Sequence, residues 1–179
     1  EPVSDITFQP TAILAEGEDP LVDALIWEFA RPNNADGSPG EWVRTEYGNG
    51  YKGAIEPGDY IVTAKLDYAH ASMPVTITAG KVARPEFNLN GGHVTIRPLP
   101  FEGAEPDSNA AVYTEFPDAT STTSYGEVKT YVPAGTTRIE VTIGSAKLED
   151  SVTVAAGDRV VKDVIVGVGH ATVNSFYVE

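Results

Sequence analysis

Few side chains in this sequence have the chemistry of a catalytic centre. It has three histidines and no cysteine, so it offers neither a thiol nucleophile nor a cysteine-based zinc site. It has no G-x-S-x-G turn and no phosphate-cradling glycine loop that leads into a helix. Carboxylates are numerous throughout the acidic chain and form no specific pair. We therefore expect no enzymatic activity and no cofactor.

Two of the histidines stand in nearly the same short phrase. His93 lies in GGHVTI and His170 in VGHATV, at equivalent positions of an internal repeat. Equivalent positions of tandem domains lie a domain length apart, so one ion cannot bridge them. No cysteine or second histidine lies within ligand spacing of either. We expect a structural role at a hinge between domains, and no metal site.

The segment NNADGSPGE resembles part of a calcium loop. Asn34, Asp36 and Gly37 fit the third, fifth and sixth positions of such a loop, but the first position falls on Pro32 and the twelfth on Val43. A loop rich in Gly, Asn and Asp needs no ion to connect two strands. The sequence therefore predicts a hairpin loop that binds no calcium.

Aromatic residues surround this loop and form the one candidate binding site. Trp42, Tyr47 and Tyr51 flank an insertion present only in the first copy of the repeat. Exposed aromatics are typical of modules that bind glycans or proteins. The competing interpretation is that Trp42 covers the open edge of its own sheet. Trp27 aligns with Tyr113 in an alternating segment, and we expect Trp27 to pack in the core.

The repeat defines the organisation of the chain. At an offset of 77 positions PVTITAG falls on SVTVAAG and Gly92-His93 on Gly169-His170, whereas EGEDP matches EGAEP at an offset of 86. A period near 80 exceeds that of common solenoids and suits a small β-domain. We predict a first domain over 1–91 and a second over 92–169. Residues 170–179 are predicted to begin a third repeat, so the sequence is expected to be part of a longer protein.

Alternating hydrophobicity predicts an all-β fold. Tyr60, Val62, Ala64 and Leu66 share one face of a strand, and Thr137, Ile139, Val141 and Ile143 share the equivalent face in the second copy. About seven short strands per copy cannot bury their apolar faces as one flat sheet. We therefore predict two tandem Greek-key β-sandwiches of the immunoglobulin-like or transthyretin-like kind, lying end to end.

The glycine turn and the strands after it carry a family resemblance. The runs EPGDYIVTA and PVTITAG, with PAGTT and SVTVAAG in the second copy, resemble bacterial extracytoplasmic sandwich modules of the carboxypeptidase-regulatory-like (transthyretin-like), PEGA and collagen-adhesin B types. The phrasing is most similar to the tandem repeats that accompany von Willebrand factor type A domains. The resemblance implies a periplasmic, secreted or cell-surface location.

Charge narrows the class of partner. The formal net charge of −14 repels nucleic acid and anionic membranes, and no apolar run approaches the length of a membrane span. Two functions remain. The first is a structural or interaction array that spaces or docks a functional domain of the same polypeptide or of another protein. The second is a glycan- or protein-binding module that uses the aromatic loop around Trp42.

Overall fold

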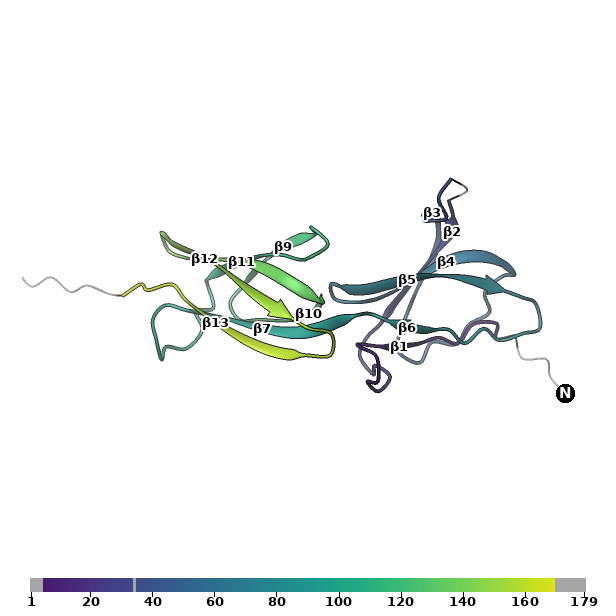
Figure 1. Cartoon of the computed structure of the whole chain (residues 1–179), viewed down its shortest axis with the longest axis horizontal. Helices are drawn as coiled ribbons and strands as arrows, with labels where there is room; N and C mark the ends of the chain where they lie inside the picture. Colours follow the sequence, from purple (N-terminus) through teal and green to yellow (C-terminus); the bar gives the residue numbers. More distant parts are fainter. Residues whose placement is uncertain (1–4, 34, 170–179) are drawn as a thin grey trace, which may run out of the picture.

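The computed structural model describes residues 5–33 and 35–169, which form thirteen strands and no helix (Figure 1). The strands are β1 (Thr11–Ile13), β2 (Ile26–Pro32), β3 (Pro39–Tyr47), β4 (Gly58–Leu66), β5 (Ala69–Ile77), β6 (Glu86–Asn88), β7 (Gly91–Leu99), β8 (Ala111–Glu115), β9 (Ser121–Tyr125), β10 (Val128–Pro133), β11 (Gly135–Ile143), β12 (Ala146–Val154) and β13 (Arg159–Ile165). The predicted all-β class is confirmed.

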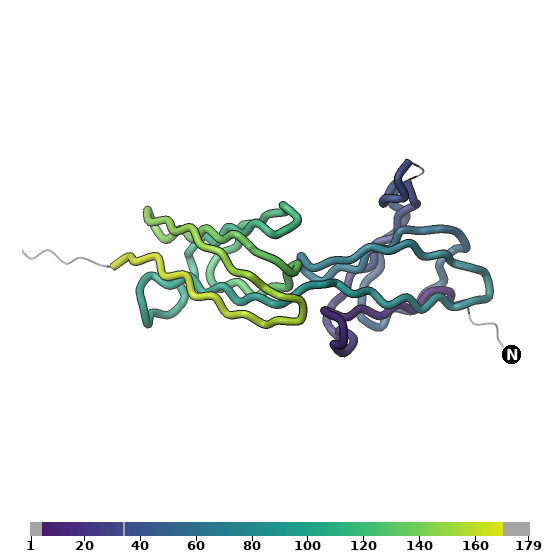
Figure 2. Tube along the Cα trace, in the orientation of Figure 1, coloured from purple at the N-terminus to yellow at the C-terminus, as the bar shows by residue number. Residues whose placement is uncertain are grey.

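The strands form two pairs of sheets. In the first half, β1–β6, a four-stranded sheet of order β3-β2-β4-β5 faces the parallel pair β1-β6. In the second half, β7–β13, the sheets have the orders β12-β11-β8-β9 and β10-β7-β13. The chain crosses between the two sheets of each half, as in a Greek-key sandwich. The halves lie end to end along the long axis of the molecule (Figures 1 and 2).

Buried side chains form two separate clusters, one per half. In the first half Trp27, Phe29 and Tyr60 of the larger sheet meet Phe8 and Phe87. The second cluster is smaller and aliphatic apart from Phe116. Its strand members come from both sheets: Val94, Ile96, Val132 and Val164 on one side, and Val112, Ile139, Val141, Val152 and Val154 on the other. The predicted inward positions are confirmed, because alternate side chains of a strand point to opposite faces.

Strand pairing confirms the repeat register. Thr11 pairs with Glu86 in the first half, and Arg97 pairs with Asp163 in the second. The offset of 86 takes Thr11 to Arg97, and the offset of 77 takes Glu86 to Asp163. Gly58 pairs with Ile77 as Gly135 pairs with Val154, again at the offset of 77. The two halves are therefore built on one plan of pairing.

One alignment inferred from the sequence is wrong by a residue. Trp27 pairs with Ala64, and the residue that pairs with Val141, the counterpart of Ala64, is Val112. Val112, not Tyr113, is thus the structural counterpart of Trp27, and both are fully buried. Tyr113 is only partly buried. The connection between the first two strands differs in length between the halves, which changes the offset by one.

The strand count is close to the prediction. The second half has the seven strands expected, but the first has six, because the segment predicted as a strand around Gly53 contributes only isolated pairing between Gly53 and Phe8. Residues 170–179, predicted to begin a third repeat, lie outside the described residues. The boundaries 1–91 and 92–169 remain a prediction about independent folding.

Candidate functional site

Trp42 and Tyr47 lie on the outer face of the first half. Both belong to β3, an edge strand, and their exposed fractions are 65% and 70%. A register shift after Phe29 sets Trp42 opposite Ala30, whose side chain points away from the core. Trp42 Nε1 donates to Thr45 Oγ1 over 3.1 Å, which fixes the indole along the strand. Trp42 is thus largely open to solvent.

Tyr51 lies on the opposite side of β3. Its ring is 6.3 Å from that of Phe8, and it packs against the first core cluster. A Cβ on Gly53 would meet the Tyr51 hydroxyl, so the ring folds over this glycine and a larger residue there would displace it. Burial, followed by the nearby Glu46 carboxylate, raises the pKa of Tyr51. The structure therefore separates Tyr51 from Trp42 and Tyr47.

The Asp36 loop satisfies its own polar groups. Asp36 Oδ1 accepts hydrogen bonds from the backbone N–H and hydroxyl of Ser38, and Asn33 Oδ1 accepts from the N–H of Ala35. The Ser38 hydroxyl and then its backbone N–H lower the pKa of Asp36. Gly37 takes a left-handed φ of 70° within this turn. Within the described part of the chain, no group of three His, Asp or Glu side chains could hold a metal ion.

His93 and His70 lie near the boundary between the halves. The imidazole of His93 meets the ring of Tyr131 edge to face, with centroids 5.0 Å apart, and burial lowers its pKa, followed by the charge of Arg159. His70 Nδ1 is 3.9 Å from a carboxylate oxygen of Asp118, across the boundary. His170 lies outside the described residues.

Backbone hydrogen bonds join the two halves at the crossing from β6 to β7. The N–H of Gly91 donates to the carbonyl of Leu14, and the N–H of Gly157 donates to the carbonyl of Gly91, over 3.0 and 2.8 Å. A Cβ on Gly92 would lie 2.3 Å from Val154 Cγ1, so the chain passes here in close contact with the second half. Gly91 is therefore packed between the two halves, and Gly92 is packed against the end of β12.

Each half places one tyrosine side chain against the core of the other half. Tyr68, in the turn between β4 and β5, packs against the second core cluster, and Tyr131 of β10 packs against the first. Tyr68 stacks on Phe116 with ring centroids 4.3 Å apart. The hydroxyl of Tyr131 is 3.5 Å from Asp23 Oδ2. Each half thus inserts an aromatic side chain against the other.

The turn that presents Tyr68 also bonds the halves directly. Asp67 adopts a left-handed φ of 50°, and its Oδ2 accepts from the backbone N–H of Tyr131 over 3.0 Å. The N–H of Tyr68 donates to the carbonyl of Tyr131 over 3.1 Å. We call this set of contacts, centred on Asp67, Tyr68, Phe116 and Tyr131, the junction. The sequence alone does not reveal the junction, and its one signal is a tyrosine directly after the alternating segment that ends at Leu66.

Comparisons with known proteins give matches only among solved structures. No family model matches the sequence, and no curated protein matches it significantly. The chain is similar to the Bacillus anthracis TIE protein, with 14% identity, a TM-score of 0.37, and coverage of 89% of this chain and 34% of that one. It is similar to a streptococcal ancillary pilin, with 14% identity, a TM-score of 0.39, and coverage of 93% and 63%.

A shaft pilin, spaA from Lactobacillus rhamnosus GG, is also similar, with 10% identity, a TM-score of 0.40, and coverage of 92% of this chain and 97% of that one. The chain spans about a third of the length of the first of these three proteins and less than two thirds of the second. No helix among the described residues is long and apolar enough to cross a membrane. The narrower resemblance to repeats beside von Willebrand factor type A domains remains a prediction.

Proposed function

We propose that this chain is a non-catalytic structural and interaction module of a larger bacterial extracytoplasmic protein. Its two sandwich halves act as a stiff spacer that sets the distance and orientation of a functional domain in the same polypeptide or in a partner. The observation that carries the proposal is the junction, where backbone hydrogen bonds and an exchanged pair of tyrosines join the halves end to end.

The connection between the two halves has little freedom to move. Two domains joined by a short flexible linker move independently unless contacts between them hold one orientation. Here β7 begins at Gly91, immediately after the first half, and Gly91 is hydrogen-bonded on both sides. A connection of this kind holds the second half at a fixed distance and orientation from the first. A spacer requires this, and a free hinge does not provide it.

The test is whether the two halves tumble as one body. Nitrogen-15 relaxation on the whole chain measures a rotational correlation time for each half. A spacer requires one common, anisotropic value for the amides of both. Two different, shorter values would show independent halves and overturn the proposal.

A second function is favoured by one observation, the outward-facing pair Trp42 and Tyr47. Two exposed aromatics on one sheet face suit stacking against a sugar ring or an apolar side chain of a partner. Trp27 is fully buried and its Nε1 donates to the carbonyl of Gly48, so Trp42 is the tryptophan in contact with solvent. Tryptophan fluorescence titrated with soluble polysaccharides therefore reports on this surface.

A glycan-binding surface requires a saturable fluorescence change that is lost in Tyr47→Ala, a variant that keeps Trp42 as the reporter. Tyr125→Phe is a suitable control, because Tyr125 occupies the position in β9 that corresponds to Tyr47 in β3 and is equally exposed. No change with any polysaccharide, or a change that persists in Tyr47→Ala, would remove this function.

A further inference from the structure

The far end of the second half repeats the face of the first half on which the second half sits. We call these the first and second exit faces. The first exit face consists of Leu14, Ala15, Asp67, Tyr68 and Gly91, and the second of Pro100, Phe101, Gly144, Ser145 and Val168. The pairs follow from the strand registers, because Ile13 and Leu99 end equivalent strands, as do Leu66 and Ile143.

Backbone hydrogen bonds show that the two faces have the same construction. Gly91 N–H donates to the carbonyl of Leu14 over 3.0 Å, and Val168 N–H donates to the carbonyl of Pro100 over 2.7 Å. Two residues before each of these donors, the N–H of Leu89 donates to the carbonyl of Ile13 and the N–H of Val166 donates to the carbonyl of Leu99, both over 2.9 Å. The chain therefore leaves the second half along the path by which it leaves the first.

Left-handed residues recur at the same places. Gly17 and Gly103 have φ of 84° and 80°, and Asp67 and Gly144, in the hairpin turns, have φ of 50° and 60°. At the exit itself, Asn90 and Gly167 have φ of 46° and 82°. Because such values fix the direction of a turn, the two faces present similarly shaped backbones.

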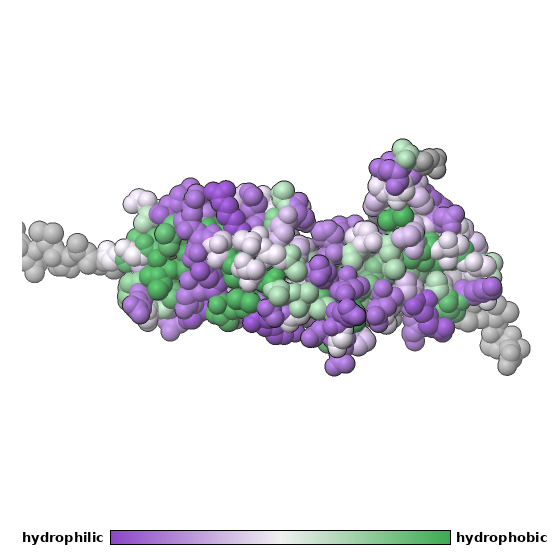
Figure 3. All heavy atoms as spheres, viewed as in Figure 1, coloured by the Kyte–Doolittle hydropathy of each residue, from purple (hydrophilic) through white to green (hydrophobic). Residues whose placement is uncertain are grey.

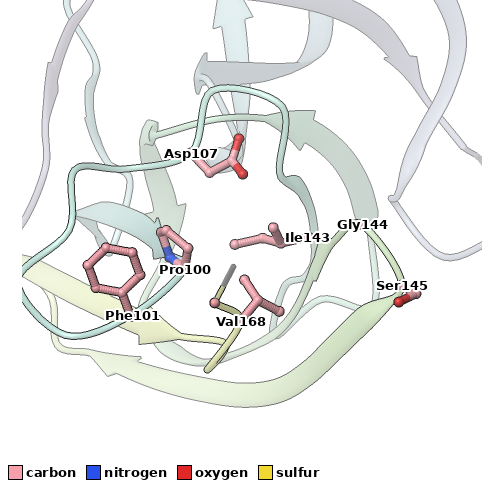
Figure 4. A pocket seen from close by; sticks show the side chains of 8 residues that line it. Pro100, Phe101, Asp107, Ile143, Gly144, Ser145 and Val168 are labelled. Carbon is pink, nitrogen blue, oxygen red and sulfur yellow. The ribbon is translucent and has the colours of Figure 1, made fainter. Parts of the chain in front are cut away.

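Leu14, Ala15 and Gly91 of the first exit face are buried, whereas the second exit face is open and apolar among the described residues. A hollow of about 450 Å³ lies between Phe101, Ile143, Ser145 and Val168 (Figure 4). The exposed fraction of Phe101 is 54%. Figure 3 shows apolar residues gathered at this end of the second half. An open apolar patch at the end of a sandwich is typical of an interaction surface.

The residues that follow the second exit face are similar to those that follow the first exit face. After Gly91 the chain reads GHVTI, and after Val168 it reads GHATV. The first of these phrases is strand β7, which enters the next sandwich. The same phrase thus follows both exit faces.

We infer that the second exit face docks a further β-sandwich repeat of this kind, end to end as the second half docks on the first. The seating differs locally, because Val168 stands in place of Gly91, where an added Cβ would lie 2.7 Å from the carbonyl oxygen of Val132. The inference rests on the proposed spacer function and extends it by naming the partner and the surface. The partner approaches through the end that corresponds to Phe116, Tyr131 and Gly157 of the second half.

Side-chain differences between the faces specify this partner. Ala15 faces Gly157, since a Cβ on Gly157 would lie 3.3 Å from that of Ala15, and Phe101 stands in place of Ala15. Tyr68, which stacks on Phe116, is replaced by Ser145, which lines the hollow. The docked repeat therefore needs a small residue opposite Phe101 and a large apolar residue over Ser145. The second half itself carries both, as Gly157 and Phe116.

The test uses a chain in which residues 93–179 follow Gly169, so that a duplicate of the second half continues from the second exit face. The duplicate is labelled by segmental ligation, and nitrogen-15 relaxation measures its tumbling. Docking requires that the duplicate share the correlation time of the preceding halves. Phe101→Asp should release it, giving a shorter correlation time, whereas Val161→Asp, an exposed apolar position on β13, should not.

A further variant shows whether a failure to dock comes from the duplicate or from the second exit face. Pro100→Leu, Phe101→Ala, Gly144→Asp, Ser145→Tyr and Val168→Gly together copy the first exit face. If the duplicate is held on this copied face but moves freely on the native one, the inference is overturned. It is also overturned if Phe101→Asp leaves the duplicate held. In a second sample the first two halves are labelled and the duplicate is not. If those two halves no longer share one correlation time, the spacer function is contradicted instead.

Discussion

Tyr68 of the first half and Phe116 of the second stack face to face, with ring centroids 4.3 Å apart and an angle of 24° between their planes. The stack lies beside the turn in which Asp67 accepts a hydrogen bond from the N–H of Tyr131. An aromatic contact and a carboxylate contact therefore act on the same short turn. This combination makes the orientation of the halves a property of a few identifiable side chains.

Tyr68→Ala should loosen the junction without unfolding either half. The change removes an aromatic pair worth about 1 kcal/mol beyond its buried area. We expect two correlation times by nitrogen-15 relaxation in place of one, and a small loss in the melting temperature. Tyr125→Ala, at an exposed tyrosine of the second half, should change neither. Unaltered tumbling in Tyr68→Ala would show that the remaining contacts of the junction hold the halves without this stack.

Gly92→Ala should destabilise the second half at the end that faces the first, where β7 passes the end of β12. The new Cβ would lie 2.3 Å from Val154 Cγ1 and 2.9 Å from the carbonyl oxygens of Ala155 and Asp158, so the second half must shift. Overpacking of this kind costs about 1–3 kcal/mol. Gly169→Ala is the matched control, because Gly169 is the repeat equivalent of Gly92 and no atom lies within 4 Å of its added Cβ. Equal melting temperatures for the two variants would contradict the close approach.

Ile139→Asp should unfold the second half. Ile139 is fully buried in the second cluster, and a carboxylate there would lose its hydration without gaining a partner, at a cost of several kcal/mol. Its neighbour Arg138 points outward and pairs with Glu149, so Arg138→Asp should cost less than about 1 kcal/mol. Urea unfolding followed by circular dichroism distinguishes the two. Similar midpoints would reverse the assignment of the two faces of β11.

Acid should weaken the packing around His93. Burial and the Arg159 charge lower the pKa of His93 in the folded state, with Lys129 acting in the same direction and Asp67 and Asp23 opposing it. The unfolded chain therefore binds the His93 proton more readily than the folded chain. Stability from this group is present above the ordinary histidine pKa of about 6.5 and is lost as the pH falls from there through the lower pKa of the folded state.

The measurement is the free energy of unfolding from pH 7.5 to pH 5.5 for the natural chain and for His93→Gln. The natural chain should lose more stability over this window, since His93→Gln removes the proton uptake on unfolding. Parallel curves for the two proteins would show that His93 makes no contribution.

The sequence by itself determined the fold class, the repeat and most of the core. Period-two alternation fixed which faces of β4 and β11 are buried, because a strand with one apolar face has one way to bury it. The offsets of 77 and 86 reappear in the pairing of Arg97 with Asp163 and of Thr11 with Glu86. The fully buried position of Trp27 followed from the same alternation.

Only the tertiary structure decided which exposed residues are covered and by what. Alternation distinguishes the two faces of a strand but carries no information about the ends of a sandwich, where a turn residue such as Tyr68 meets the other half. It also could not separate Tyr51, folded over Gly53, from Trp42, because a register shift between Arg44 and Trp42 changes the face of β3 that Trp42 occupies. Contacts between distant turns depend on how whole sheets are placed, and local periodicity does not encode that placement.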